Sequence, residues 1–339
     1  MNAYRHGGDI VAFAKRAGCR IDEVIDLSSN INFVTPRVNL DLDHIDLAPY
    51  PNYDELYAAL AQHYGVAIEE MELFNGASAA IFALFAHFQD RLTHCCIYAP
   101  AYVEYKKAAR LFSYETVQID RFSAPDTLPP KGALVIFVNP STPDGKYYAI
   151  DTLFEIWRER ACTVVIDESF IEFTDTPSAS TKLATYPKLY ILKSLTKYWG
   201  AAGVRIGALL SNIANITALR YREPLWKISA FDMHYILAAL NDKDFPEKSK
   251  VQNAANKALL LSILKRSPLI DTIHPSNANF VLVKLKGIDA PSLQAKLQPY
   301  RILIRDCSNF DGLDQTYIRL AVKEKNKIQH LLKALQKII

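Results

Sequence analysis

A lysine placed among hydroxyl, glycine and arginine residues is the part of the sequence best suited to covalent chemistry. Lys197 ends the run Ser194-Leu195-Thr196-Lys197, and Gly203-Val204-Arg205-Ile206-Gly207 follows it. A lysine among aromatic and small residues can be desolvated, which lowers its pKa and frees the amine to attack an aldehyde. The hydroxyls and Arg205 are groups that bind phosphate. This pattern favours a Schiff base between Lys197 and pyridoxal phosphate (PLP), and the alternative is a solvated loop joining two strands.

Polar residues also follow other predicted strands, at the point where each strand ends. Near-continuous apolar runs alternate with helical patterns, which predicts a mostly parallel sheet covered on both faces. In such sheets a ligand binds outside the carboxyl ends of the strands. Three residues just past strand ends are therefore expected to meet at one site: Asn139, Asp167 and Lys197.

The apolar periodicity predicts an α/β chain with two domains. Helices are expected at 10–17, 54–63, 79–88, 102–112, 150–160, 212–222, 230–240, 246–265, 291–297 and 324–338. Strands are expected at 95–99, 114–119, 132–138, 162–166, 189–192, 206–210, 280–285, 302–305 and 315–322. We assign 1–45 to an N-terminal arm and part of the small domain, 46–240 to a large PLP-binding domain, and 241–339 to a small C-terminal α+β domain.

Composition excludes several classes of protein. The 339 residues are 50% hydrophobic and 22% charged, which fits a globular enzyme. A net charge of +3 without a basic stripe argues against nucleic-acid binding. No apolar run is long enough for a membrane span, and residues 1–9 are polar with no apolar signal core, so we do not expect a secreted protein. The five cysteines have neither ladder nor metal-ligand spacing, so we expect reduced thiols in the cytoplasm and no metal.

Three motifs in this order resemble the fold-type I PLP enzymes of the aspartate aminotransferase class over essentially the whole chain. They are Asp167-Glu168-Ser169-Phe170, Ser194-Leu195-Thr196-Lys197 and Gly203-Val204-Arg205-Ile206-Gly207. The resemblance implies a PLP-dependent transferase fold, with a mostly parallel seven-stranded sheet in the large domain and a smaller α+β domain. Within the class the chain resembles histidinol-phosphate aminotransferases, and still more the threonine-phosphate decarboxylases of cobalamin biosynthesis. Four segments carry the closer similarity: 6–10, 26–32, 301–310 and 317–322.

The resemblance assigns roles around the cofactor ring. Lys197 is implied to form the Schiff base and to transfer protons, and Asp167 is implied to keep the ring nitrogen protonated. Tyr102 is implied to stack on the ring, and the alternative is a tyrosine of the core.

The resemblance also assigns the phosphate site of the cofactor. Backbone N–H groups at a helix start, a hydroxyl and a guanidinium are implied to bind it. These groups belong to Ala77, Ser78, Ser194 and Arg205. Tyr50 matches a tyrosine that reaches the phosphate of the neighbouring subunit, which implies a homodimer with composite active sites.

Three positions depart from the family pattern. Thr142 stands where an asparagine usually donates a hydrogen bond to the cofactor O3′, and Asn139 or a water are the alternatives for that donor. Phe170 replaces a tyrosine that touches the same oxygen in aminotransferases, as in the decarboxylase branch. Ala77-Ser78 replaces the Glu-Thr expected in the decarboxylase turn, an exchange that preserves backbone donation.

The resemblance implies a phosphorylated amino acid as the substrate. The candidates for holding its phosphate and carboxylate are His6, Gly7, Ile31, Asn32, Arg305 and Arg319. A single arginine in an apolar strand is more often part of a structural ion pair, so Arg305 and Arg319 carry that alternative. The expected reaction is decarboxylation of threonine phosphate or serine phosphate. The alternatives are transamination of histidinol phosphate and a PLP-binding protein without turnover.

Overall fold

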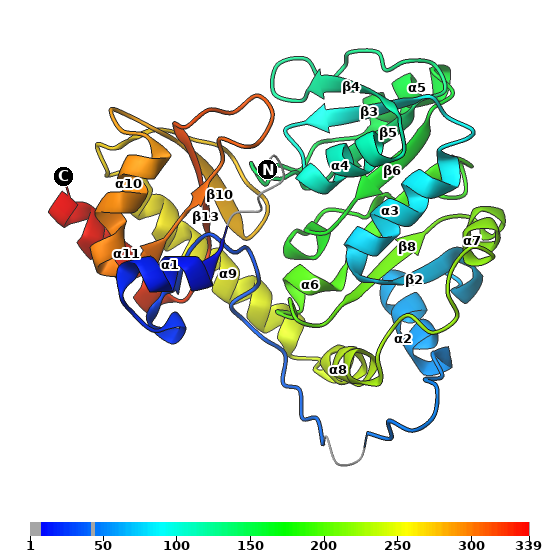
Figure 1. Ribbon diagram of the computed structural model, residues 1–339, viewed down its shortest axis with the longest axis horizontal. Helices are drawn as coiled ribbons and strands as arrows, with labels where there is room; N and C mark the ends of the chain where they lie inside the picture. The colour runs from blue at the N-terminus through cyan, green and yellow to red at the C-terminus, as the bar shows by residue number, and fades with distance from the viewer. Residues whose placement is uncertain (1–7, 42–44, 339) are drawn as a thin grey trace.

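A seven-stranded sheet forms the centre of the larger of two units in the computed structural model, which describes residues 8–41 and 45–338 (Figure 1). The strand order is β2-β8-β7-β6-β5-β3-β4. Strand β8 is antiparallel to both of its neighbours, and the other pairs are parallel, as the sequence predicts. The strands are β2 (Met71–Asn75), β3 (His94–Ala99), β4 (Glu115–Asp120), β5 (Leu134–Val138), β6 (Thr163–Asp167), β7 (Leu189–Ser194) and β8 (Ile206–Leu210).

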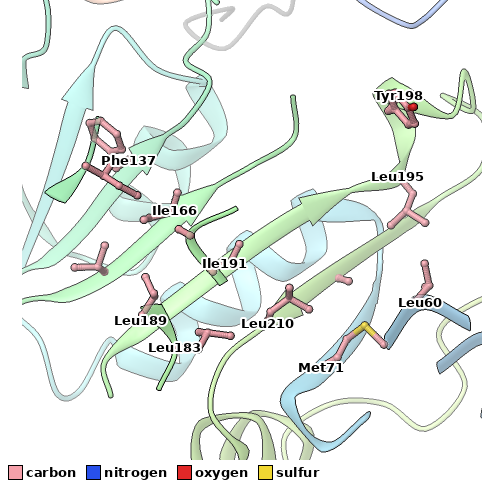
Figure 2. Close-up of a cluster of buried hydrophobic side chains, with 14 of the residues drawn as sticks. Leu60, Met71, Phe137, Ile166, Leu183, Leu189, Ile191, Leu195, Tyr198 and Leu210 are labelled. Carbon is pink, nitrogen blue, oxygen red and sulfur yellow. The ribbon is translucent and has the colours of Figure 1, made fainter. Parts of the chain in front are cut away.

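Helices cover both faces of this sheet, because alternate strand residues point to opposite sides and both sets are apolar. Figure 2 shows part of the core on one face, where Phe137, Ile166, Ile191 and Leu210 pack together. That core includes residues of α2 (Asp54–Tyr64), α5 (Asp151–Glu159), α6 (Leu195–Tyr198) and α8 (Ala230–Asn241). The core on the other face includes residues of α3 (Gly76–Phe88), α4 (Val103–Leu111) and α7 (Ile213–Arg220).

The smaller unit joins both ends of the described chain. Its four-stranded antiparallel sheet has the order β12-β13-β10-β9, and a separate parallel pair joins β1 to β11. The strands are β1 (Ile25–Asp26), β9 (Ile270–Ile273), β10 (Phe280–Leu285), β11 (Ile302–Leu303), β12 (Arg305–Asp306) and β13 (Tyr317–Ala321). The helices are α1 (Ile10–Ala17), α9 (Phe245–Leu264), α10 (Ala290–Leu297) and α11 (Lys325–Ile338).

Helix α9 runs from one unit to the other (Figure 1). Its first residue, Phe245, belongs to the core of the large unit, while Leu260 and Leu264 belong to the core of the small one. The pairing of β1 with β11 likewise ties the N-terminal segment to the C-terminal unit. The domain boundaries at 45/46 and 240/241 stay predictions.

Most predicted elements coincide with observed ones; the short elements β1 and α6 were not predicted, and three further differences have physical reasons. Strand β2 was not predicted, because its sequence leads directly into the Asn75-Gly76 turn signal; helix α3 therefore begins at Gly76 and not at residue 79. Strand β9 is only partly buried, so its apolar pattern is weak. The predicted strand 302–305 is divided between β11 and β12, which pair with different partners.

The structure bears on two features considered from composition, the state of the cysteines and the length of apolar helices. All five cysteines are free thiols, and all but Cys19 are buried. Within residues 8–41 and 45–338, none of the helices combines the length and apolarity needed to cross a bilayer.

Candidate active site

A cavity of about 470 Å³ opens at the carboxyl ends of the parallel strands, between the two units. Its volume lies in the range of small-molecule sites. Ten of the residues predicted from the sequence line this cavity. They are Ala77, Ser78, Tyr102, Thr142, Asp167, Ser194, Lys197, Arg205, Arg305 and Arg319.

Lys197 lies in the short helix α6, which follows directly on β7. Its backbone carbonyl accepts a hydrogen bond from the Asn32 N–H at 2.9 Å, which holds the turn. The pKa of the amine is lowered to about 8, chiefly by burial and to a smaller extent by the positive charges of Arg319 and Arg205. A substantial fraction of Lys197 is therefore neutral near pH 8, the form that attacks an aldehyde.

Asp167 is a buried carboxylate at the end of β6, with 5% of its surface exposed. Its Oδ1 accepts hydrogen bonds from Ser169 N at 2.9 Å and Ser169 Oγ at 2.5 Å. Its Oδ2 accepts a hydrogen bond from the Tyr105 hydroxyl at 2.7 Å. Burial raises the pKa of Asp167, and the hydrogen bonds from Ser169 and Tyr105 oppose that shift.

The N-terminus of helix α3 forms the part of the wall suited to phosphate. Gly76 has a φ of +78°, and the Arg205 guanidinium packs directly against it. A Cβ atom at this position would lie only 2.5 Å from a guanidinium nitrogen of Arg205, so a larger residue would displace that side chain. A Cβ atom on Gly207 of β8 would approach Ala77 N to 2.5 Å, so this glycine lets the helix start lie against the sheet. The positive end of the helix dipole, free N–H groups and Arg205 thereby face the same space.

Tyr102 lines the cavity just before helix α4, where it is the N-cap residue. Burial raises the pKa of its hydroxyl, and a hydrogen bond with Ser78 opposes the shift. This contact connects the Tyr102 side chain to the helix start that faces phosphate.

Two arginines of the small unit enter the cavity side by side. Arg305 of β12 and Arg319 of β13 are direct cross-strand partners. Within the described residues neither forms the ion pair with a carboxylate that the structural alternative would require, and their hydrogen-bond partners are neutral oxygens. Arg319 donates to Thr142 Oγ1 at 3.1 Å and to the Ser28 carbonyl at 3.0 Å, while its buried Nε has no hydrogen-bond partner among residues 8–41 and 45–338. Burial lowers the pKa of Arg319 to about 10.

Thr142 and Phe170 complete the wall near Arg319. Thr142 lies in a loop that the Asn139 side chain stabilises. Asn139 Nδ2 donates to the Tyr148 carbonyl at 3.1 Å, and Asn139 Oδ1 accepts from Tyr148 N at 2.9 Å. Asn139 is thus committed to the loop and does not line the cavity, which leaves Thr142 as the polar side chain of this segment there. Phe170 packs edge-on against Phe280, whose ring lies 5.1 Å from the Arg319 guanidinium.

Several predicted residues do not meet the others. The buried Asn32 donates to the Tyr198 carbonyl and Ser249 Oγ, both at 2.8 Å, and its oxygen accepts from Val34 N and Asn253. Its amide is fully used in packing, so we correct its predicted substrate contact to a structural role. Ile31 also lies outside the cavity wall, and its carbonyl accepts from Lys323 at 3.2 Å.

The other expectations concern residues beyond this cavity. Tyr50 is 73% exposed and stacks on Trp226 with ring centroids 4.0 Å apart, so it does not reach the phosphate site of its own chain. His6 and Gly7 lie outside the described residues. The next residue along, Gly8, lines the cavity.

The structure adds residues that sequence reasoning missed. Tyr105 donates a hydrogen bond to Asp167. The sequence held one indication of this role: Tyr105 comes three residues after Tyr102 at the start of a helix, a spacing that puts both side chains on one face. At the mouth, Lys106 Nζ lies 2.7 Å from Asp311 Oδ1, and Arg110 lines the same wall. The local sequence could not predict this contact, because Lys106 and Asp311 are 205 positions apart.

Comparison with known proteins places this geometry in a family. A sequence profile described as aminotransferase class I and II matches residues 22–335. The chain belongs to this family. Class I and II aminotransferases depend on pyridoxal phosphate, and the cavity fits that cofactor: an amine of lowered pKa, a buried carboxylate and a phosphate-binding helix start face one space.

The relatives of this family member include proteins named for cobalamin biosynthesis or threonine-phosphate decarboxylation and proteins named histidinol-phosphate aminotransferases. It is 30% identical to the adenosylcobalamin biosynthesis bifunctional protein CobDQ of Leptospira interrogans, over 96% of this chain but only 40% of that protein's length. It is 27% identical to threonine-phosphate decarboxylase of Salmonella typhimurium, over 98% of this chain and 96% of that one. The crystal structure of histidinol-phosphate aminotransferase from Clostridium acetobutylicum aligns with TM-score 0.80 and 26% identity, covering 92% and 98% of the two chains.

Proposed function

We propose that this protein is a PLP-dependent carboxy-lyase that decarboxylates a phosphorylated amino acid, L-threonine O-3-phosphate or L-serine O-phosphate. The observation that carries the proposal is the pair Arg305 and Arg319. Two like charges directly opposite in adjacent strands repel each other, and neither has a carboxylate partner in the described chain. A substrate with a phosphate and a carboxylate supplies one anion for each guanidinium.

The cavity residues divide into a cofactor set and a substrate set in this proposal. When bound, pyridoxal phosphate supplies an aldehyde for an amine and a ring that withdraws electrons from Cα. Arg205 and the start of α3 hold its phosphate, Asp167 pairs with its ring nitrogen, and Tyr102 lies on its face. Arg305 and Arg319 orient the substrate so that the bond from Cα to the carboxylate breaks and CO₂ leaves, and Lys197 or a water supplies the proton that replaces it on Cα.

The names of two relatives support the decarboxylase assignment. A threonine-phosphate decarboxylase and a bifunctional protein of adenosylcobalamin biosynthesis are 27% and 30% identical to this chain. The amino-alcohol phosphate produced would then serve the nucleotide loop of a cobamide. The two candidate substrates differ by one methyl group, which a pocket distinguishes only modestly.

Transamination of histidinol phosphate is the second candidate, favoured by the 26% identity to a histidinol-phosphate aminotransferase of the same fold. Histidinol phosphate carries a phosphate and an imidazole but no carboxylate, so it leaves one of the two arginines unmatched. Its amino-group partner, glutamate, carries two carboxylates and would match both.

A homodimer is part of the proposal. Large apolar side chains lie exposed near Tyr50, and a second copy of the chain is the partner that would cover them. They are Leu47, Tyr50, Leu225 and Trp226, which are 53–76% exposed. Tyr50 would then reach the cofactor phosphate of the other subunit. Five free thiols, four of them buried, support a reducing compartment such as the cytoplasm.

A single-turnover experiment separates the two reactions. The PLP-loaded protein is mixed with less than one equivalent of serine phosphate, threonine phosphate or histidinol phosphate, and both CO₂ and pyridoxamine phosphate are measured. CO₂ release without pyridoxamine phosphate supports the decarboxylase. Pyridoxamine phosphate from histidinol phosphate without CO₂ from either amino-acid phosphate refutes it in favour of the aminotransferase.

A further inference from the structure

Tyr105 is a buried tyrosine that touches both residues assigned to the cofactor ring. Its hydroxyl donates to Asp167 Oδ2 at 2.7 Å, and its ring meets the Tyr102 ring edge-on at 6.3 Å and 84°. Tyr105 is 1% exposed and does not itself line the cavity. It therefore has no access to a ligand except through these two neighbours.

The hydrogen bonds of Asp167 leave one acceptor position free. A carboxylate has about four lone-pair sites. Ser169 fills two of them on Oδ1 through its N–H and its hydroxyl, and Tyr105 fills one on Oδ2. The remaining site on Oδ2 is the one available to a ring N–H of the cofactor.

We propose that Tyr105 is a positioning residue, which holds Asp167 charged and turned so that Oδ2 receives the cofactor ring nitrogen, while it braces Tyr102 for the ring face. Both functions come from one side chain because Tyr102 and Tyr105 are three residues apart at the start of α4. The inference rests on the PLP assignment of Asp167 and not on which reaction the protein catalyses.

Burial explains why such a donor is needed. A carboxylate removed from water tends to take up a proton, and a neutral acid cannot keep the ring nitrogen protonated. Burial raises the pKa of Asp167, and donation from Tyr105 opposes it. Removing the hydroxyl would let Asp167 protonate at a higher pH.

The test compares two cofactors in Tyr105→Phe. One is PLP and the other is 1-deazapyridoxal phosphate, in which a C–H replaces the ring nitrogen. Because a hydrogen bond to a charged group is lost, the variant should bind PLP roughly 10-fold more weakly or worse. Its affinity for the deaza analogue should stay within about 2-fold of the wild type. The loss of PLP affinity should deepen as the pH falls.

Tyr114→Phe is the matched control, since the Tyr114 hydroxyl is also buried but donates to the Phe85 carbonyl, away from the cavity. It should bind both cofactors as the wild type does. Equal weakening of PLP and analogue in Tyr105→Phe, or no change in either, overturns the positioning role and leaves packing alone. Asp167→Asn tests the premise that Asp167 contacts the cofactor. If this variant binds PLP with wild-type affinity, the PLP assignment of Asp167 fails, whatever the result with Tyr105→Phe.

Discussion

Arg305 and Arg319 stand directly opposite each other in β12 and β13, and both reach the cavity. Arg305 is held by Asn309 Oδ1 at 2.8 Å and lies over the Phe310 ring, whereas Arg319 is held by Thr142 and the Ser28 carbonyl. Their anchors belong to different parts of the chain, so the two guanidiniums are fixed independently. Each can then serve a different anion of one substrate.

Substituting each arginine should reveal that division. Losing a hydrogen bond to a charged group costs about 1.5–3 kcal/mol, so Arg305→Gln and Arg319→Gln should each lower kcat/KM for serine phosphate roughly 10- to 150-fold. With serine, which lacks the phosphate, only the arginine that holds the carboxylate should still matter. Steady-state CO₂ release with both substrates measures this. Equal losses on serine for both variants would contradict separate anion sites.

Lys197 gives the cofactor-free protein a pH-dependent stability. Its ordinary pKa of 10.5 falls to about 8 in the folded protein, so between these values the unfolded chain binds more protons than the folded one. The free energy of unfolding should therefore rise with pH across pH 8–10.5. Lys197→Met removes this dependence and should be more stable than the wild type at pH 7, by on the order of 1–3 kcal/mol. The difference should shrink at pH 10.5 in urea titrations, and a constant difference would argue against a lowered pKa.

The same substitution bears on the chemistry. Without the amine, CO₂ release should fall by on the order of 10²–10⁴-fold or more, because both the attachment of the cofactor and a proton carrier are lost. Lys182→Met, at an exposed lysine paired with Asp151, is the control and should retain full turnover. Undiminished turnover by Lys197→Met would exclude the PLP assignment of this lysine.

The sequence could predict the sheet and much of the cavity because their signals are local. Strands β8 and β10 coincide with the predicted ranges, and Asp167 and Lys197 follow strands whose carboxyl ends share one edge. The structural role of Asn32 could not be predicted, because its hydrogen-bond partners Ser249 and Asn253 belong to α9, more than 200 positions away. Short polar side chains look alike in a sequence whether they bind a ligand or each other.

Phe170 offers a test of the departure from aminotransferases. Phe170→Tyr adds a hydroxyl at a buried position in the cavity wall. A new donor near the cofactor oxygen stabilises its ionised form, so the pH midpoint of the absorbance change of bound PLP should move downward. Phe173→Tyr, which adds a hydroxyl outside this cavity, should leave the midpoint unchanged. An unchanged midpoint in both variants would mean that residue 170 does not approach that oxygen.

Behind the site, Glu168 and Lys193 form a buried ion pair at 2.5 Å between the ends of β6 and β7. Their side chains are only 2% and 5% exposed. Removing one partner leaves an uncompensated buried charge, so Lys193→Met should lower the free energy of unfolding by about 3–5 kcal/mol. Lys182→Met breaks an exposed pair with Asp151 and should cost about 0–1 kcal/mol in the same denaturation experiment. Similar losses in both variants would contradict the buried pair.

At the cavity mouth, Asp311 of the small unit is held by two residues of the large one. Lys106 Nζ lies 2.7 Å from Asp311 Oδ1, and Gln118 Nε2 donates to Asp311 Oδ2 at 2.8 Å. The loop that carries Asp311 also carries Asn309 and Phe310, the anchors of Arg305.

Asp311→Asn should therefore loosen the setting of Arg305 and raise KM for the phosphorylated substrate several-fold, by roughly 2- to 10-fold, with little change in kcat. Because Lys106 and Asp311 are 49% and 37% exposed, the free energy of unfolding should change by less than about 1 kcal/mol. Asp314→Asn is the control, since the side-chain hydrogen bonds that Asp314 forms with described residues lie within its own loop, to Thr316. A KM that rises equally in both variants would point to general loosening of the loop, and no rise in Asp311→Asn would show that the contact between the units does not position Arg305.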